Sequence, residues 1–209
     1  MTQDDFLIDG PGDAAHTLVL AHGAGGPMDS PFLNRVAAGL AAQGVRVVRF
    51  EFPYMARRRA SEGGGRGAPD RPAVLEARWK EVVEQLGGGP SLFLGGKSMG
   101  GRIASMVADE VSARGLVCMG YPFHPPGAPA KLRTAHLAAL RTPTLILQGT
   151  RDAFGSREEI ANYALSPAIT VHYLEGGDHS FKPPARAGKT EAQNLAEAIA
   201  ATGDFLNAH

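Results

Sequence analysis

The stretch Ser91-Leu-Phe-Leu-Gly-Gly-Lys-Ser-Met-Gly-Gly-Arg102 decides the fold of this chain of 209 residues. Its apolar start is typical of a buried strand, and residues 102–109 that follow have the spacing of a helix. Between them, Gly96-Lys97-Ser98-Met99-Gly100 matches G-x-S-x-G, a sharp strand-to-helix turn that presents a serine hydroxyl above a sheet. A side chain at Gly96 or Gly100 would collide across so tight a turn. The stretch therefore predicts strand, turn and helix, with Ser98 projecting from the turn.

Two other interpretations of this stretch have to be considered. Gly96-Lys97-Ser98 also fits the end of a phosphate-binding P-loop, but that motif needs a glycine where Ser91 stands and a flexible loop where these residues favour a strand. A glycine-rich turn without chemistry is the second alternative. The five residues alone leave it open, so the rest of the chain has to decide.

Composition points to an ordinary globular chain. Hydrophobic residues make up 44% of it and charged residues 20%, with a formal net charge of +0. These values exclude a disordered chain and a generally basic nucleic-acid binder, so we expect no nucleic-acid partner. We expect residues 1–209 to form one domain, because this length suits one α/β domain and is short for two.

Targeting and cofactor signals are also lacking in the sequence. The first residues have neither the basic region nor the apolar run of a signal peptide, and no segment approaches the roughly 18 apolar residues of a membrane span. We therefore expect a soluble, cytoplasmic protein without a membrane partner. The single cysteine, Cys118, lies in an apolar run and is expected to be a buried, unreactive thiol. Metal-ligand spacings such as C-x-x-C do not occur, so we expect no metal and no cofactor.

Strands and helices are predicted to alternate along the whole chain. The expected strands are 6–8, 16–21, 45–50, 91–94, 115–119, 144–148 and 169–174. The expected helices are 31–42, 73–86, 102–109, 134–140, 156–165 and 190–209. Residues 53–72, rich in Arg, Gly and Pro, are expected to form a long mobile loop. This alternation predicts an α/β fold with a mainly parallel sheet, helices on both faces and little material for a lid.

Polar residues follow three of these strands at the edge where an open α/β sheet binds ligands. They are Ser98, Asp152 and His179, in the chain order nucleophile, acid, histidine. A serine hydroxyl needs a base to take its proton, and the base needs a carboxylate to fix its tautomer. His179 is the expected base and Asp152 the expected carboxylate. Asp178 competes for that role, but it adjoins His179 in the chain and is expected to shape the loop instead.

Residues His22-Gly-Ala-Gly25 are expected to complete this site. A developing oxyanion needs two N–H donors, for which the backbones of Met99 and Ala24 are the candidates. The rival interpretation is a dinucleotide-binding loop, with Glu51 as the acid that binds ribose. It fails at the third glycine of that motif, where Met28 stands.

The basic run Arg57-Arg58-Arg59 lies in the predicted loop 53–72. Since this loop follows a strand, it is expected to hang near the edge of the site. One hypothesis is that the three arginines favour anionic substrates. Its alternative is a solvated loop without a role, because charge runs usually face water.

Four sequence blocks together resemble the α/β-hydrolases of the small, lid-less kind. They are Ala21-His-Gly-Ala-Gly-Gly, Gly95-Gly-Lys-Ser-Met-Gly-Gly-Arg, Leu147-Gln-Gly-Thr-Arg-Asp and Gly176-Gly-Asp-His-Ser-Phe. The resemblance is closest to a dienelactone-hydrolase-like group that includes a testis-expressed protein and a subunit of a chromatin-acetylation complex. It implies the triad Ser98, Asp152 and His179. True dienelactone hydrolases use a cysteine nucleophile, so their substrate is not carried over.

Two functions follow as hypotheses from different classes. The first is a serine hydrolase that cleaves an ester, thioester or small amide through an acyl-enzyme, with a small acyl compound as its partner. The second is a hydrolase-like binding or scaffold protein, which the chromatin-complex relative suggests. An intact triad and a glycine-built oxyanion loop favour the enzyme, because a scaffold needs neither. The substrate and the oligomeric state do not follow from the sequence.

Overall fold

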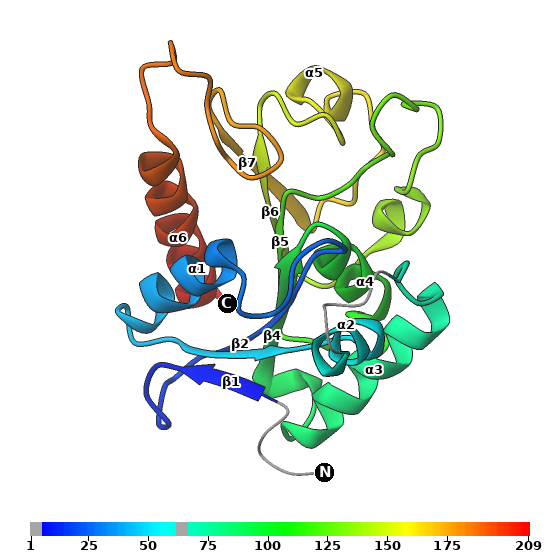
Figure 1. Cartoon of the computed structure of the whole chain (residues 1–209), viewed down its shortest axis with the longest axis vertical. Coiled ribbons are helices and arrows are strands. Elements are labelled where there is room, and N and C mark those ends of the chain that lie inside the picture. The colour runs from blue at the N-terminus through cyan, green and yellow to red at the C-terminus, as the bar shows by residue number, and fades with distance from the viewer. Residues whose placement is uncertain (1–5, 62–66) are drawn as a thin grey trace.

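A seven-stranded sheet runs through the molecule (Figure 1). The structure, a computed structural model, describes residues 6–61 and 67–209. The strands are β1 (Phe6–Asp9), β2 (Thr17–Ala21), β3 (Arg46–Phe50), β4 (Leu92–Lys97), β5 (Gly115–Met119), β6 (Thr144–Gly149) and β7 (Ile169–Leu174). Their order is β1-β3-β2-β4-β5-β6-β7, with β1 antiparallel to β3 and every other pair parallel. The prediction of a mainly parallel α/β sheet is confirmed.

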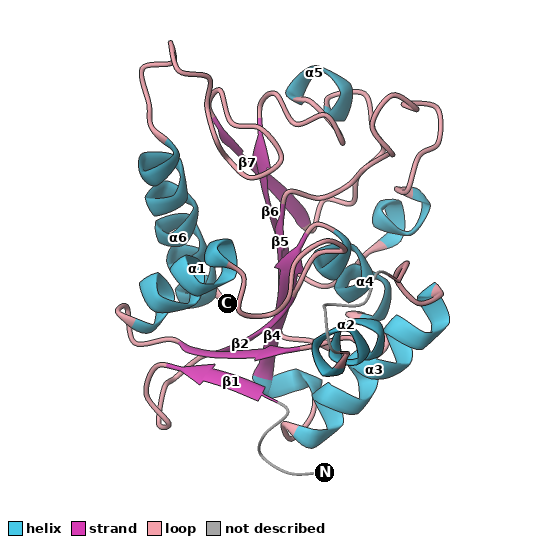
Figure 2. Cartoon of the chain, in the orientation of Figure 1, coloured by secondary structure: helices cyan, strands magenta, loops and turns pink. Residues whose placement is uncertain are grey.

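Helices cover both faces of this sheet, as predicted. They are α1 (Pro31–Ala41), α2 (Pro53–Ala60), α3 (Pro72–Gln85), α4 (Met99–Val107), α5 (Arg157–Ile160) and α6 (Glu191–Ala208), with short 3₁₀ helices η2 (Gly89–Ser91) and η3 (Ala135–Ala139). Figure 2 shows α1 and α6 on one side of the sheet and α2, α3 and α4 on the other. The connection between β5 and β6, all of which is described, holds only η3, which leaves no substantial lid there.

The core consists of two hydrophobic clusters, one on each face. Side chains of a strand point alternately to opposite faces of the sheet, so the side chains of β2 are distributed between the two clusters. Val19 and Ala21 join the cluster that contains Trp79 of α3, whereas Leu18 and Leu20 join the cluster that contains the buried residues of α1 and α6. The sheet is therefore buried on both faces.

The predicted loop 53–72 is wrong for its first part, because Pro53–Ala60 forms helix α2. Proline is favoured in a first helical turn, and Tyr54 and Met55 are buried beneath the helix. Arg59 forms ion pairs with Glu51 and Asp29. The sequence does not reveal these buried side chains and ion pairs, because an Arg-rich composition favours a loop. Residues 62–66 of the predicted loop lie outside the described residues.

Helix α5 is shorter than predicted, since it covers Arg157–Ile160 and not residues 156–165. The predicted capping box is present, because the Ser156 hydroxyl accepts from the Glu159 N–H and the Glu159 carboxylate accepts from the Ser156 N–H. The Asn162 amide donates to the Glu158 carbonyl, a local bond that competes with helix continuation. The start of this helix could be read from the sequence and its end could not.

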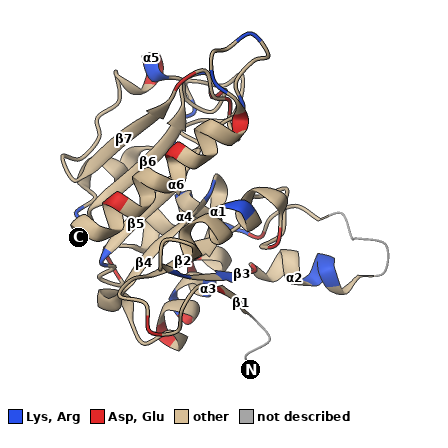
Figure 3. Ribbon diagram, turned by 90° about the vertical axis from the view of Figure 1, so that its left-hand side faces the viewer, with Lys and Arg blue, Asp and Glu red and all other residues tan. Residues whose placement is uncertain are grey.

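Charged residues of both signs are distributed over the elements, and the basic run of α2 forms one blue segment of the ribbon in Figure 3. None of the helices in the described parts of the chain is long and apolar enough to cross a membrane. Cys118 is buried in β5, as predicted, and burial raises the pKa of its thiol.

Candidate active site

The turn between β4 and α4 holds Ser98 in a strained conformation, with φ 52° and ψ −117°. Its backbone N–H donates to the Met119 carbonyl at 2.9 Å, and its carbonyl accepts from the Arg102 N–H at 3.0 Å. Non-glycine residues seldom adopt a positive φ, and such outliers gather at functional sites. Because residues before Ser98 form strand β4, the segment is not a phosphate-binding loop.

The two glycines of the turn are required by close backbone approach. A β-carbon at Gly96 would lie 2.6 Å from the Ala21 carbonyl oxygen, and one at Gly100 would lie 2.5 Å from the same atom. β2 therefore packs directly against the turn. This contact is the physical reason for the predicted glycine spacing.

We expect Gly96→Ala to lower the free energy of unfolding by about 1–3 kcal/mol, because a methyl group there meets backbone that cannot move aside easily. Urea denaturation of the variant and the parent protein measures the loss. The matched control is Gly12→Ala, where an added β-carbon meets nothing within 4 Å. Equal stability of the two variants would contradict the packing described here.

Ser98, His179 and Asp152 lie in one hydrogen-bonded chain. The Ser98 Oγ is 2.8 Å from Nε2 of His179, and Nδ1 of His179 is 2.8 Å from Oδ2 of Asp152. Because a carboxylate only accepts, Nδ1 carries the proton and Nε2 is the acceptor that faces the serine hydroxyl. The structure thus brings together three residues that are 27 and 81 positions apart along the chain.

The Asp152 carboxylate is held by two further donors. Its Oδ1 accepts from the Phe154 N–H at 2.8 Å, and its Oδ2 accepts from the Gln148 side-chain amide at 2.9 Å. Gln148 is itself fixed, since its Oε1 accepts from the Tyr121 N–H at 2.8 Å. Asp152 is 1% exposed, so these bonds replace the water that a buried carboxylate has lost. Its orientation toward the imidazole is therefore set by β6 and the turn after it.

Asp178 has a different position, as the sequence predicts. Its Oδ1 accepts from the N–H groups of Ser180 and Lys182, which closes the turn around His179. Phe181 in this turn has a φ of 70°. Its carbonyl, and that of Glu175, accept from the side-chain amide of Asn194, a fully buried residue of α6. Helix α6 therefore anchors the histidine loop from behind.

Other residues hold the imidazole in place. The ring of Phe154 stacks on that of His179 with centroids 4.2 Å apart. The Lys97 ammonium donates to the His179 carbonyl at 2.7 Å, and burial lowers the pKa of this lysine to about 8. Gly120, with φ 66°, leaves room for the loop, because a β-carbon there would lie 2.7 Å from the His179 carbonyl oxygen. The imidazole of His179 is thus packed on two sides.

The loop after β2 is fixed by His22. The Phe52 N–H donates to its Nε2 at 3.1 Å, so Nδ1 carries the proton and donates to the Gly23 carbonyl at 2.8 Å. Burial lowers the pKa of His22, which keeps the ring neutral and this pattern intact. The Tyr54 hydroxyl donates to the Ala24 carbonyl at 3.1 Å. The loop therefore has a defined conformation beside the turn.

Ala24 and Met99, the two predicted oxyanion donors, line the same pocket as Ser98. Within residues 6–61 and 67–209, neither backbone N–H donates a hydrogen bond. Two free N–H groups beside a serine hydroxyl have the chemistry that stabilises a developing oxyanion. Met99 also begins α4, whose N-terminus favours negative charge.

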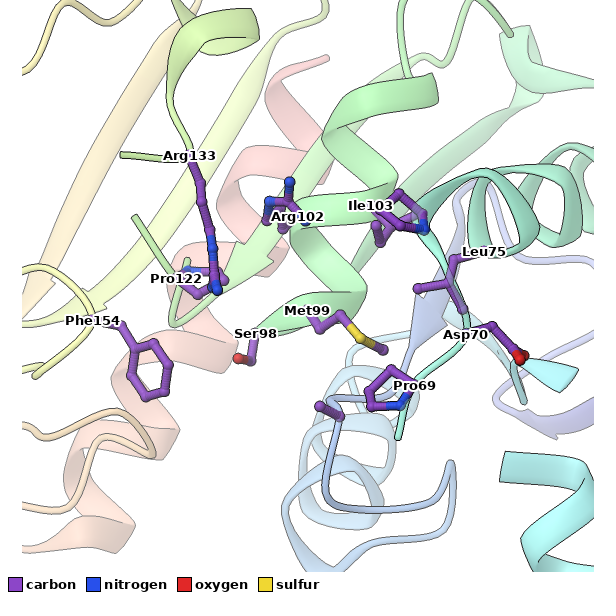
Figure 4. A pocket seen from close by; sticks show the side chains of 12 residues that line it. Pro69, Asp70, Leu75, Ser98, Met99, Arg102, Ile103, Pro122, Arg133 and Phe154 are labelled. Carbon is purple, nitrogen blue, oxygen red and sulfur yellow. The ribbon is translucent and has the colours of Figure 1, made fainter. Parts of the chain in front are cut away.

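The pocket beside Ser98 has a volume of about 340 Å³ (Figure 4). One wall is apolar, with Leu75 of α3 and Ile103 of α4. The full lining is Ala24, Pro69, Asp70, Pro72, Leu75, Ser98, Met99, Arg102, Ile103, Pro122, Arg133 and Phe154. Pro69, Asp70 and Pro72 come from the end of the segment that the sequence places near the site, so this part of the prediction is confirmed.

Comparison with known proteins identifies the family. Residues 14–207 match a family model described as an alpha/beta hydrolase domain. The chain belongs to the α/β-hydrolase family. The resemblance inferred from the four sequence blocks is thus confirmed for nearly the whole length of this α/β-hydrolase.

Solved structures of other α/β-hydrolases share its fold. A dienelactone hydrolase from Anabaena variabilis has 20% identity and a TM-score of 0.73, over 98% of this chain and 91% of that one. A lid-less α/β serine hydrolase from Xanthomonas campestris has 19% identity and a TM-score of 0.69, over 97% and 88%. A serine hydrolase homologue from Coxiella burnetii has 21% identity and a TM-score of 0.66, over 96% and 90%. At these identities the likeness concerns the fold alone.

Arg57, Arg58 and Arg59 of this α/β-hydrolase have other partners in the structure. Arg57 pairs with the pocket-lining Asp70 at 2.6 Å, Arg58 lies over the Tyr54 ring, and Arg59 pairs with Asp29 before α1 and Glu51 after β3. The three are not among the pocket-lining residues. The hypothesis that they favour anionic substrates gains no support from their placement.

Proposed function

We propose that this α/β-hydrolase is a serine hydrolase that cleaves a small ester, thioester or amide through an acyl-enzyme. The observation that carries the proposal is the 2.8 Å distance from Ser98 Oγ to His179 Nε2, with Asp152 on the opposite nitrogen. A nucleophile, a base and an orienting carboxylate in this order are the parts that acyl transfer requires. The reaction needs no cofactor.

The first half of the reaction forms the acyl-enzyme. Ser98 Oγ attacks the carbonyl carbon while its proton passes to Nε2 of His179. The carbonyl oxygen becomes an oxyanion, which the N–H groups of Ala24 and Met99 stabilise. When the intermediate collapses, the bond to the leaving group breaks, and the leaving group takes the proton from Nε2.

The second half returns the enzyme to its starting state. A water molecule gives a proton to Nε2 of His179 and attacks the acyl carbon, which forms a second oxyanion in the same place. Its collapse breaks the bond to Ser98 Oγ, and the serine takes the proton back. Asp152 stays ionised throughout and stabilises the imidazolium in both halves.

A fluorophosphonate probe tests this proposal, because it reacts with an activated serine beside oxyanion donors. We expect stoichiometric labelling of Ser98 in folded protein, located by peptide mass spectrometry, and none in protein denatured beforehand. Folded protein that stays unlabelled would favour the binding or scaffold function instead.

A second serine and histidine provide a matched control. Ser105 Oγ is also 2.8 Å from a histidine Nε2, that of His136, but Ser105 is 3% exposed and donates its hydroxyl proton to the Arg102 carbonyl. Ser105→Ala should be labelled as well as the parent protein, whereas Ser98→Ala should not. Labelling that is lost with Ser105 and kept without Ser98 would overturn the assignment.

A further inference from the structure

Two arginines in the pocket beside Ser98 have no acidic partner. Arg102 extends from α4, and Arg133 lies in the connection between β5 and η3. Both line the pocket of about 340 Å³. Across residues 6–61 and 67–209, neither guanidinium forms an ion pair or a side-chain hydrogen bond, and the Nε of Arg102 is buried without a partner. A ligand or an ordered water has to satisfy such a donor.

Their surroundings leave the positive charge uncompensated. Burial and the nearby charge of Arg102 lower the pKa of Arg133, and the same two causes lower the pKa of His136. Two cations that line one partly desolvated pocket repel each other, and a bound anion would relieve this repulsion.

Asp70, the acid among the pocket-lining residues, does not neutralise them. It pairs with Arg57 at 2.6 Å. Figure 4 shows Arg102 and Arg133 on one side of the pocket and Asp70 on the other side of Met99. Ser98 lies below the two arginines and beside Met99 in this view. An anion held by the arginines would thus sit in the same pocket as the reacting group.

We propose that Arg102 and Arg133 bind a carboxylate of the substrate, so that the enzyme cleaves esters or related acyl compounds that carry an acid group. This inference rests on the proposed serine hydrolase function and names its substrate class. A guanidinium presents a planar fork of donors that matches a carboxylate. The apolar wall formed by Leu75 and Ile103 suits a short carbon chain between the acid group and the scissile bond.

Two activated esters with equal acyl chains test the proposal. The 4-nitrophenyl monoester of glutaric acid and 4-nitrophenyl pentanoate both have five acyl carbons, and they differ in a terminal carboxylate or methyl group. After subtraction of the uncatalysed rate, we expect kcat/KM of the parent enzyme to favour the glutarate ester by about 10- to 100-fold.

Arg102→Gln and Arg133→Gln should each reduce this preference by about tenfold or more, mainly through KM, because the contact is made before and during the reaction. Arg102→Lys should restore part of it, since the charge returns without the fork. The matched control is Arg141→Gln, an arginine with 83% of its side chain exposed that lies before the start of β6. It should keep the parent preference.

Equal kcat/KM of the parent enzyme for the two esters would overturn the carboxylate site and leave the serine hydrolase intact. A variant that loses both esters in parallel would do the same. If the parent enzyme cleaves neither ester, the proposed function is in question, and calorimetric titration with glutarate decides the site. Binding to the parent protein that is lost in the double variant Arg102→Gln, Arg133→Gln supports it, and no binding to the parent protein contradicts it. Circular dichroism confirms that each variant folds.

Discussion

Ser98→Ala is expected to lower turnover of an activated ester on the order of 10⁶-fold, because it removes the nucleophile of the proposed reaction. His179 and the two oxyanion donors remain in this variant, so any residual rate measures what they contribute alone. The fold should persist, since Ser98 Oγ bonds only to His179 and the backbone bonds of the turn do not involve it. Circular dichroism and thermal unfolding check this.

The measurement is the steady-state rate of 4-nitrophenyl pentanoate hydrolysis, with enzyme concentration high enough to detect a residual rate. Ser180→Ala is the matched control, because Ser180 follows His179 in the same loop and only its backbone N–H takes part in the turn. A Ser98→Ala variant that retains more than about one tenth of the parent rate would mean that another group is the nucleophile.

Asp152→Asn is expected to lower turnover on the order of 10⁴-fold, as the corresponding change does in serine proteases. The bonds around the carboxylate give the reason. Oδ1 accepts from the Phe154 N–H, so the amide oxygen of the asparagine would take that place. Its NH₂ group would then face Nδ1 of His179 and the donating amide of Gln148. Two donors cannot share a bond, so the imidazole would turn its proton toward Ser98.

Asp178→Asn is the matched control for this prediction. The Asp178 Oδ1 accepts from two backbone N–H groups, and an asparagine oxygen can accept both. Turnover of this variant should fall far less than that of Asp152→Asn, on the same ester and with folding confirmed. A larger loss in the Asp178 variant would show that the assignment of the orienting carboxylate is wrong.

The parts of the fold and site that depend on local sequence could be predicted. The turn at Ser98 is such a case, because the close approach of Gly96 and Gly100 to β2 demands glycine at fixed positions. The strands could be predicted because a sheet buried on both faces needs apolar runs. Asp152 and His179 followed from the rule that parallel strands end at one edge.

Other features depend on tertiary contacts that no local pattern contains. Helix α2 is stabilised by the burial of Tyr54 and by ion pairs of Arg59, and both were hidden in a stretch that reads as a loop. Nothing in the sequence distinguishes Phe154 from other loop phenylalanines, and only the structure shows its ring stacked on that of His179. Gln148 is the exception, because a polar residue near the end of an apolar strand indicates a buried side chain with a hydrogen-bond partner.

The two pocket arginines also could not be predicted from a local pattern. Arg102 and Arg133 are separated by β5 in the sequence, and only the folded chain places both in one pocket. The sequence hypothesis named the basic run Arg57 to Arg59, whereas the arginines that line the pocket are Arg102 and Arg133. An arginine without an acidic partner is a better indication of an anion site than a run of surface arginines, because the members of a run usually pair with nearby acidic residues.

The anchoring of the histidine loop by Asn194 couples α6 to His179 in local unfolding. Asn194 is fully buried and donates to the carbonyls of Glu175 and Phe181. If α6 detaches, both carbonyls lose their buried donor, and the loop that carries His179 loses its support from this helix. An opening of α6 would therefore release the imidazole while the strands of the sheet remain paired, so that the catalytic geometry is lost before the fold.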